Sequence, residues 1–269
     1  MPAVSIIMPV YNAAPYLEEA IGSMLKQTYT DLECIVINDG STDGSDAVVR
    51  SFRDPRLRYL ENDGNKGLVY TLNRGLDEAR GKYIARMDGD DISLPERLDV
   101  QVAYMEKHPE VDVLASVVRL IDAQGNPTGY WKEDRDHVQA EAINAMLPVN
   151  NCIAHPSVLV RTEVLRSFRY LNSQAQAEDY DLWLRMRSAG RTIHKLEQPL
   201  LLHRILPGSF TRQRQQNVFF KLAETKLRFA LAELRAGHRN RVVMKAGLSS
   251  FSDYGKGYLK EMKHWISPE

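Results

Sequence analysis

The sequence has few cysteines and no excess of either charge. Only Cys34 and Cys152 occur among 269 residues, without a matching histidine cluster, which argues against a disulfide framework and gives no zinc site. We expect Cys34 to be a small core residue in a buried strand. Lys+Arg 35 and Asp+Glu 35 cancel, so the net charge does not argue for a nucleic-acid partner.

Long apolar runs and an export signal are also missing. No run approaches the roughly 18 apolar residues of a membrane-spanning helix, and the first ten residues do not resemble a signal peptide. We therefore expect a cytoplasmic chain that does not cross a membrane. No Gly-x-Gly-x-x-Gly follows the first expected strand and no Gly-Lys-Ser/Thr occurs, which disfavours a Rossmann dinucleotide site and a P-loop.

What the sequence does contain is an alternation of strands and helices through about the first 100 residues. This pattern predicts an α/β fold, with a mostly parallel sheet covered by helices on both faces. In such sheets ligands bind outside the carboxyl ends of the strands. We expect strands at 4–10, 32–38, 57–60 and 82–87, and helices from about 15, at 43–52 and at 67–79.

The alternation loosens beyond residue 100. We expect helices at 95–108 and 178–189, and strands at 111–121, 157–160 and 199–203. Near Pro207-Gly208 the pattern breaks, and a helical apolar stripe runs from Phe219 to Leu234. These features predict one catalytic domain over 1–210, with halves at about 1–100 and 101–210, and a helical extension over 211–269.

An acidic cluster follows the strand expected at 82–87. Asp88, Asp90 and Asp91 place three carboxylates within four residues, where they repel one another. Mg²⁺ and Mn²⁺ prefer carboxylate oxygens and often share their coordination with substrate phosphates. A solvated turn or a helix cap is the alternative reading of the same residues.

Other polar residues fall at the ends of neighbouring strands. Asp39 opens a segment that resembles an EF-hand loop, but Arg50 stands where calcium needs a bidentate Glu, so we reject calcium. Asp39 fits a carboxylate that holds a ribose or base, and a plain turn fits equally well. Tyr11 can stack on a base or pack as a rim residue.

Further candidates are open to structural readings when each is taken singly. Glu178 and Asp179 begin an expected helix, where acidic residues favour the helix dipole. His155 and His203, taken singly, are each more often structural than catalytic.

Taken together, these residues resemble the family 2 glycosyltransferases of GT-A fold. The resemblance covers roughly residues 3–210 and leaves the last ~55 unexplained. Its motifs are Ser5-Ile-Ile-Met-Pro-Val-Tyr-Asn12, Ile37-Asn-Asp-Gly-Ser-Thr-Asp43, Asn65-Lys-Gly67, Leu72-Asn-Arg-Gly75, Gly81-Lys-Tyr-Ile-Ala-Arg-Met-Asp-Gly-Asp-Asp91, His155-Pro-Ser-Val158 and Glu178-Asp-Tyr-Asp-Leu-Trp183.

The resemblance implies transfer of a sugar from a nucleotide diphosphate donor to an acceptor hydroxyl, usually with inversion. Pro9, Tyr11 and Asp39 would hold the base, with Asp39 accepting from a ring N–H, which favours UDP or dTDP over GDP. Asn12, Asn65 and Lys66 would line the nucleotide crevice. The acceptor would be a glycan or a lipid-linked glycan.

The resemblance also assigns roles in the reaction. Asp88 would contact the ribose and Asp90 would ligate Mn²⁺ or Mg²⁺. Asp179 would be the base, oriented by Glu178. The remaining candidates would either contact the acceptor or hold the residues named above in position. They are Asp91, His155, Trp183, His203 and Arg204.

The sequence also bears on processivity and on other classes of protein. Gln213-Arg-Gln-Gln-Asn217 lacks the Trp of the processive Gln-x-x-Arg-Trp motif, which favours transfer of one sugar per encounter. A non-catalytic nucleotide-sugar binding protein of the same fold is the alternative. A nucleotidyltransferase is disfavoured because the Gly-rich, Arg-containing loop it needs after the first strand is missing.

The tail beyond Gln213 is basic, with eleven Lys or Arg against five Asp or Glu, a net charge of +6. A basic amphipathic segment ending in Tyr258, Met262, Trp265 and Ile266 is compatible with an anionic membrane surface. Packing against the core or a second subunit is the other reading, and we weigh it as the stronger of the two.

Overall fold

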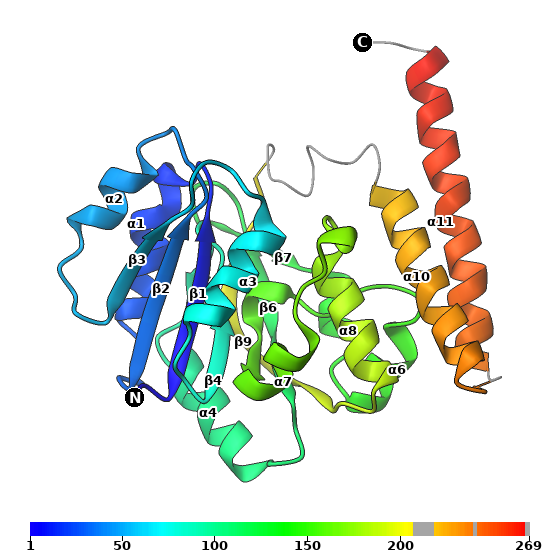
Figure 1. The fold of residues 1–269 in the computed structure, drawn as a ribbon, viewed down its shortest axis with the longest axis horizontal. Coiled ribbons are helices and arrows are strands. Elements are labelled where there is room, and N and C mark those ends of the chain that lie inside the picture. The colour runs from blue at the N-terminus through cyan, green and yellow to red at the C-terminus, as the bar shows by residue number, and fades with distance from the viewer. Residues whose placement is uncertain (207–217, 239–240, 267–269) are drawn as a thin grey trace.

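The computed structural model describes residues 1–206, 218–238 and 241–266, with side chains described as far as Lys260 (Figure 1). The break expected at Pro207-Gly208, the Gln213–Asn217 motif and the side chains of Met262, Trp265 and Ile266 lie outside the described residues. Within the described part, no helix is long and apolar enough to cross a bilayer.

The centre of the molecule is one nine-stranded sheet with the order β3-β2-β1-β4-β8-β6-β9-β5, and β7 pairs with β6. β1 to β4 run parallel, as do β6 and β9, whereas β8, β5 and β7 run the opposite way. The strands are β1 Val4–Val10, β2 Leu32–Asn38, β3 Leu57–Glu61, β4 Tyr83–Arg86, β5 Ile92–Ser93, β6 Val113–Ile121, β7 Pro127–Tyr130, β8 Leu159–Arg161 and β9 Ile193–Arg204.

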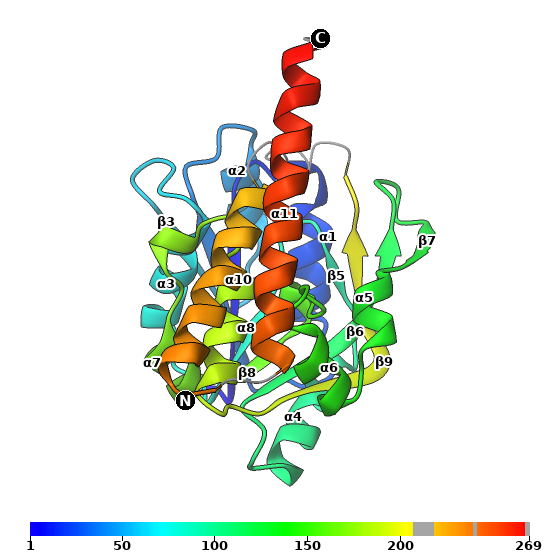
Figure 2. The same ribbon diagram turned by 90° about the vertical axis from the view of Figure 1, so that its right-hand side faces the viewer.

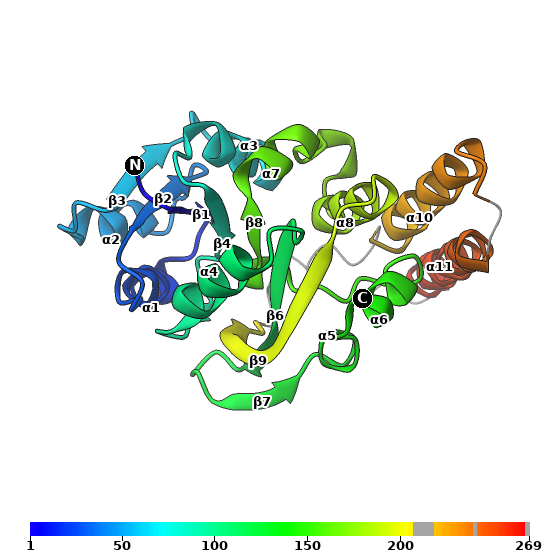
Figure 3. The ribbon, with the colours of Figure 1, turned by 90° about the horizontal axis from the view of Figure 1, so that it is seen from below.

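Helices cover both faces of this sheet, which confirms the predicted α/β architecture (Figure 3). The α-helices are α1 Ala14–Leu25, α2 Ser45–Ser51, α3 Leu68–Glu78, α4 Arg97–Lys107, α5 Lys132–Asp136, α6 Ala140–Met146, α7 Thr162–Phe168, α8 Glu178–Ser188, α10 Val218–Arg235 and α11 Arg241–Ile266. Short 3₁₀ turns occur at His155–Ser157 and Asn172–Gln174.

The two faces follow from the alternation of side chains along each strand. In β1, Ile7 belongs to the core under α3, while Ile6 and Met8 belong to the core under α1. Cys34 is fully buried on the α1 side, as predicted, and both cysteines are free and buried.

The strand ends place the site. β1, β2 and β4 are neighbouring parallel strands, so their carboxyl ends at Val10, Asn38 and Arg86 lie along one edge of the sheet. β9 is longer than the expected 199–203 and pairs with β6 from Ile193 onward, with a register shift between Ser116 and Val118. Its last residues reach the same edge.

Candidate active site

The acidic cluster lies in the short connection between β4 and β5. The chain leaves the sheet after Arg86, passes Asp88 to Asp91, and re-enters it at Ile92 as a two-residue strand. The tight packing at Gly89, where an added Cβ would lie 3.3 Å from that of Ala13, holds this loop against the start of α1. The loop is therefore packed against the protein core and is not a free, solvated turn.

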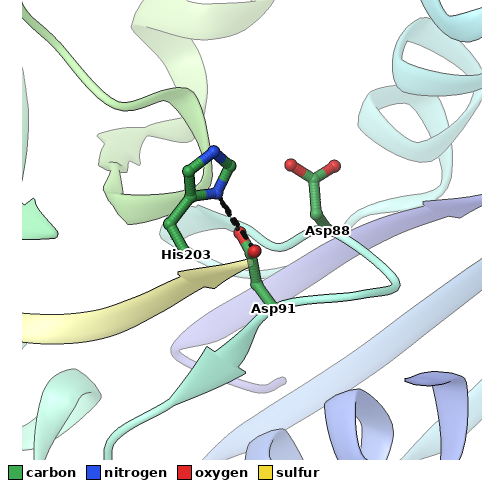
Figure 4. Close-up of side chains that lie close together, drawn as sticks. All are labelled: Asp88, Asp91 and His203. Atoms are coloured by element: carbon green, nitrogen blue, oxygen red, sulfur yellow. Dashed lines mark hydrogen bonds and ion pairs between the residues drawn. The ribbon is translucent and has the colours of Figure 1, made fainter. Parts of the chain in front are cut away.

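The pairing of β5 with β9 brings His203 to this cluster. Ile92 lies opposite Leu202 in this antiparallel pair, so His203, the next residue of β9, faces Asp91, the last residue of the loop. His203 Nδ1 lies 3.0 Å from both carboxylate oxygens of Asp91, and the backbone N–H of Arg204 donates to Asp91 Oδ1 at 2.8 Å. Figure 4 shows His203 and Asp91 meeting, with Asp88 beside them.

Asp91 and Arg204 hold the site's frame. Asp91 is fully buried and its oxygens accept from β9. The Arg204 guanidinium donates to the backbone carbonyls of Asp90, Asp122 and Ala123 and pairs with Glu19. These bonds connect the acidic loop to α1 and to the β6–β7 turn. Arg204 thus stabilises the backbone around the site, and none of these contacts supports the expectation that it binds the acceptor.

Arg86, the last residue of β4, carries a buried positive charge beneath the cluster. It forms an ion pair with Asp88, and this pairing outweighs the burial that would lower the pKa of its guanidinium, so that pKa is raised. Burial raises the pKa values of Glu178 and Asp179, and the charge of Arg86 opposes that rise. Arg86 therefore pairs with Asp88, and its charge also acts on the pKa values of the acidic pair, a role that the sequence reasoning missed.

The crowding of carboxylates shifts the pKa values of two groups. Burial first, and then the charges of Asp88 and Asp91, raise the pKa of Asp90 to about 7. Burial alone would lower the pKa of His203, but Asp91, Asp88 and Asp90 outweigh it and raise that pKa to about 9. Three carboxylates thus crowd one short loop, and a bound cation would relieve their mutual repulsion.

The donor set fits such a cation. Asp88, Asp91 and His203 each offer one ligand atom, and these atoms lie within 4.8 Å of one another. Two carboxylates and an imidazole suit Mn²⁺, and the carboxylates suit Mg²⁺ as well. Asp90, the ligand expected from the sequence, is not in this group, whereas His203, expected to contact the acceptor or to support other site residues, belongs to it.

Asp39 organises the loop after β3. Its Oδ1 accepts from Asn62 Nδ2 at 2.7 Å and from the backbone N–H of Lys66 at 2.8 Å, and its Oδ2 accepts from the N–H of Gly67 at 2.8 Å. A Cβ at Gly40 would lie 2.6 Å from the Gly64 carbonyl carbon, so this close approach requires glycine. The 62–67 loop is therefore held against the end of β2, with Asn65 and Lys66 exposed.

The turn after β1 presents an aromatic ring. Tyr11 is 51% exposed, so it is not a packed rim residue. Asn12 has a positive φ of 50° and its Oδ1 accepts from the Thr42 N–H at 2.8 Å. Pro9 is half-buried in β1. Asp43 accepts from Ala14 and Ser45 as a helix cap, the structural alternative weighed for this segment.

The acidic pair sits at the start of α8, as its sequence predicted. Asn151 Nδ2 donates to Asp179 Oδ2 at 2.9 Å, and the Gln176 N–H donates to Glu178 Oε2 at 2.8 Å. Burial, followed by the charge of Asp179, raises the pKa of Glu178 to about 7, and burial raises the pKa of Asp179 as well. Sequence reasoning missed Asn151, which lies 28 residues before its partner.

His155 and Trp183 form the packed floor beside this pair. His155 Nε2 lies 2.8 Å from the Tyr170 hydroxyl, and burial, then Arg86, holds its pKa well below the usual value. Trp183 is fully buried and its ring lies edge-on to that of His155. Both are therefore positioned to support the site, and Trp183 offers no exposed surface for an acceptor.

The sheet edge thus brings together a carboxylate-held loop, an exposed aromatic ring, a cation-type cluster and an acidic pair at the start of α8. The sequence profile described as "Glycosyl transferase family 2" matches residues 5–168. The chain belongs to this family, as the motifs predicted.

Two relatives show the range of the family. A glycosyltransferase of Methanocaldococcus jannaschii is 32% identical over 208 residues, covering 76% of this chain and 71% of the relative. The O-antigen biosynthesis glycosyltransferase WbnJ of Escherichia coli is 31% identical over 236 residues, covering 84% and 87% of the two chains. The chain is thus a glycosyltransferase.

Solved structures confirm the GT-A fold. S. aureus TarS 1-349 in complex with UDP-GlcNAc superposes with a TM-score of 0.75 at 21% identity, covering 94% of this chain and 73% of that one. The mannosyltransferase PcManGT from Pyrobaculum calidifontis, in complex with GDP-Man and Mn²⁺, gives a TM-score of 0.66 at 18% identity, covering 96% and 75%.

Proposed function

We propose that this chain is a metal-dependent, inverting glycosyltransferase that moves a sugar from a UDP-sugar to a hydroxyl of a glycan or lipid-linked acceptor. The observation that carries the proposal is the donor group of Asp88, Asp91 and His203 at the sheet edge, together with the acidic pair held at the start of α8. A donor phosphate site and a base are the two parts that sugar transfer needs. The cytoplasmic location stays a prediction.

The nucleotide is proposed to lie across the ends of β1 and β2. A carboxylate has about four acceptor positions, and Asp39 uses three of them on Asn62, Lys66 and Gly67. The remaining position suits the ring N–H of uracil. Tyr11 would stack on the base, Pro9 would border it, and Asn12, Asn65 and Lys66 would line the crevice.

The diphosphate is proposed to face the cluster. Asp88, Asp91 and His203 form the donor group that the geometry gathers, with Asp90 as the ligand assigned from the sequence and Asp88 also near the ribose. A bound Mn²⁺ or Mg²⁺ stabilises the negative charge that develops on a leaving diphosphate. Arg86 holds Asp88 in place from below, and Asp91 keeps His203 in position.

Asp179 is proposed to remove the proton of the acceptor hydroxyl as it attacks the anomeric carbon from the face opposite the leaving group. Its raised pKa favours proton uptake near neutral pH, and general base catalysis contributes typically 10²–10⁴-fold. Asn151 fixes the orientation of one oxygen, which leaves the other for the acceptor. Glu178 lies beside it and orients the pair.

The bound ligands of the structural neighbours support a nucleotide-sugar donor, and the role of WbnJ in O-antigen biosynthesis supports a glycan acceptor. The test is a panel of UDP-, dTDP- and GDP-sugars with Mn²⁺, read as nucleotide release. We expect release from one UDP-sugar, because slow hydrolysis accompanies donor binding. Binding of a donor without release, with or without glycan acceptors, would indicate a non-catalytic binding protein instead.

A further inference from the structure

The hairpin of α10 and α11 carries most of the exposed apolar surface of the described chain. Of the eleven large hydrophobic side chains that are exposed there, seven lie on these two helices. We call them the hairpin surface: Leu231, Leu234, Met244, Leu248, Phe251, Tyr258 and Leu259. Those on α11 are 61–73% exposed. Single exposed hydrophobics are ordinary, but such a concentration marks an interaction site.

The exposed apolar side chains on α11 form one continuous face. Met244, Leu248 and Phe251 recur at intervals of four and three, which places them on one side of a helix. The opposite side of α11 is buried: Ala246, Ser250 and Gly257 turn toward the molecule, and a Cβ at Gly257 would lie 2.8 Å from the Phe220 ring. The inner face therefore holds the helix in place, while the outer face has no cover among the described residues.

The charges beside this face are mostly positive. Among the described residues of α10 and α11, five basic residues are exposed, Arg228, Arg235, Arg241, Lys245 and Lys256, and the partly exposed Glu224 is paired with Lys221. The described carboxylates of the hairpin each have a basic partner, such as buried Asp253, which pairs with Lys226 at 2.5 Å. The outer side is thus apolar with basic borders.

We propose that the hairpin surface docks on an anionic lipid bilayer, with its apolar side chains in the interface and its basic borders at the headgroups. Helices of this kind lie in the plane of the interface, and each Lys or Arg near an anionic surface contributes about 1 kcal/mol. A second copy of the chain is the less suitable occupant, because twofold contact through this face would bring two basic borders together.

The position of the hairpin determines which part of the molecule would face the bilayer. α11 extends beyond the body of the molecule on the side where the parallel strands end (Figure 1), and α10 and α11 lie side by side on one flank of the molecule, facing the viewer in Figure 2. Docking would hold the candidate site at that edge close to the bilayer. Resting on the proposed function, this selects lipid-linked glycans as the acceptor class.

Vesicle co-sedimentation of the full chain tests the proposal. We expect binding to phosphatidylcholine vesicles that contain phosphatidylglycerol, and much weaker binding to phosphatidylcholine alone or at high salt. Leu248→Ser combined with Phe251→Ser should weaken binding by at least about tenfold, since each side chain loses apolar burial. Arg241→Gln with Lys245→Gln should weaken binding to the vesicles that contain phosphatidylglycerol and leave the weak binding to phosphatidylcholine alone unchanged. Tyr130→Ser, an equally simple change of an exposed ring on β7, should change nothing.

Two results would overturn the proposal. One is the failure of the unmodified chain to bind anionic vesicles even at low salt. The other is a concentration-dependent dimer, seen by analytical ultracentrifugation, that the Leu248→Ser, Phe251→Ser variant dissociates, which would assign the surface to a second copy. Nucleotide release from the donor, measured without vesicles, should be the same in all variants, so this test and that of the proposed function fail separately.

Discussion

At the scale of single residues, Asp179 carries the sharpest prediction. Asp179→Asn keeps the bond with Asn151 within reach but removes the proton acceptor, so we expect transfer to fall by roughly 10²–10⁴-fold while donor binding stays unchanged. Transfer is measured with a matched acceptor, and donor binding by calorimetry. Asp136→Asn, a change at an exposed carboxylate of α5, is the control. Full transfer by the Asp179→Asn variant would remove Asp179 from the mechanism.

Glu178 makes a prediction about pH and stability. Its pKa is about 7 in the folded chain, raised first by burial and then by Asp179, against a usual value of 4.5. Between these pH values the folded state binds more protons than the unfolded state, so its contribution is stabilising at low pH and is lost as pH rises toward 7.

Glu178→Gln should remove that dependence. Relative to the unmodified chain, we expect the variant to gain up to about 3 kcal/mol more in free energy of unfolding at pH 8 than at pH 5. Urea unfolding at the two pH values measures the difference. Glu197→Gln, at an exposed glutamate of β9, should show none. An equal gain at both pH values would mean that Glu178 is not protonated in the folded chain at low pH.

Residues differ in how far the sequence could place them. The sequence predicted that Asp88, Asp90 and Asp91 cluster, because they are neighbours in the chain and follow a buried strand. It did not predict that His203 meets Asp91, because that contact depends on the pairing of β5 with β9 across 112 residues. The bond between Asn151 and Asp179, which spans 28 residues, was hidden for the same kind of reason.

At the scale of elements, two glycines give a matched test of packing. A Cβ at Gly75 in α3 would lie 2.5 Å from Ile7 Cγ2 and 2.8 Å from Ile37 Cδ1, whereas one at Gly22 in α1 would meet nothing within 4 Å. Gly75→Ala should therefore lower the free energy of unfolding by ~1–3 kcal/mol. Gly22→Ala should raise it by ~0.5–1 kcal/mol, because alanine favours the helix.

Chemical denaturation of both variants measures these changes. We expect the two changes in the free energy of unfolding to have opposite signs. Both substitutions gain the same helix propensity, and only the space available for the new methyl group differs. A gain at both positions would mean that α3 moves away from β1 and β2 without cost, and that the α3 face of the sheet is packed less tightly than its contacts indicate.

Elements with a clear apolar pattern were predictable, including the short strands β3 and β8, whereas other short elements were not. β2 begins and ends where its buried run predicted, and α8 ends within one residue of the expected position. β5, α5, α6 and α7 were missed because two to seven residues show little periodicity, and tertiary pairing decides their structure. Missing β5 matters most for the site, because the pairing of β5 with β9 brings the acidic loop next to His203.

At the scale of the whole molecule, the site joins segments from the start of the chain to the end of β9. Tyr11, Asp39, Asp88 and His203 come from four parts of the sequence and come to one edge of the sheet only when the sheet is complete. A ligand that binds across them therefore binds the folded chain and not the unfolded one. Binding of this kind raises stability by about 2.7 kcal/mol at a ligand concentration of 100 Kd.

We therefore expect UDP together with Mn²⁺ to raise the melting temperature by at least about 5 °C at such a concentration. EDTA should remove most of the increase, because UDP alone brings its diphosphate against uncompensated carboxylates. His203→Ala should reduce the increase with Mn²⁺ but leave the small effect of UDP in EDTA unchanged. An increase that is equal with EDTA and with Mn²⁺ would contradict a cation between the cluster and the diphosphate, since the protein would then bind the nucleotide without it.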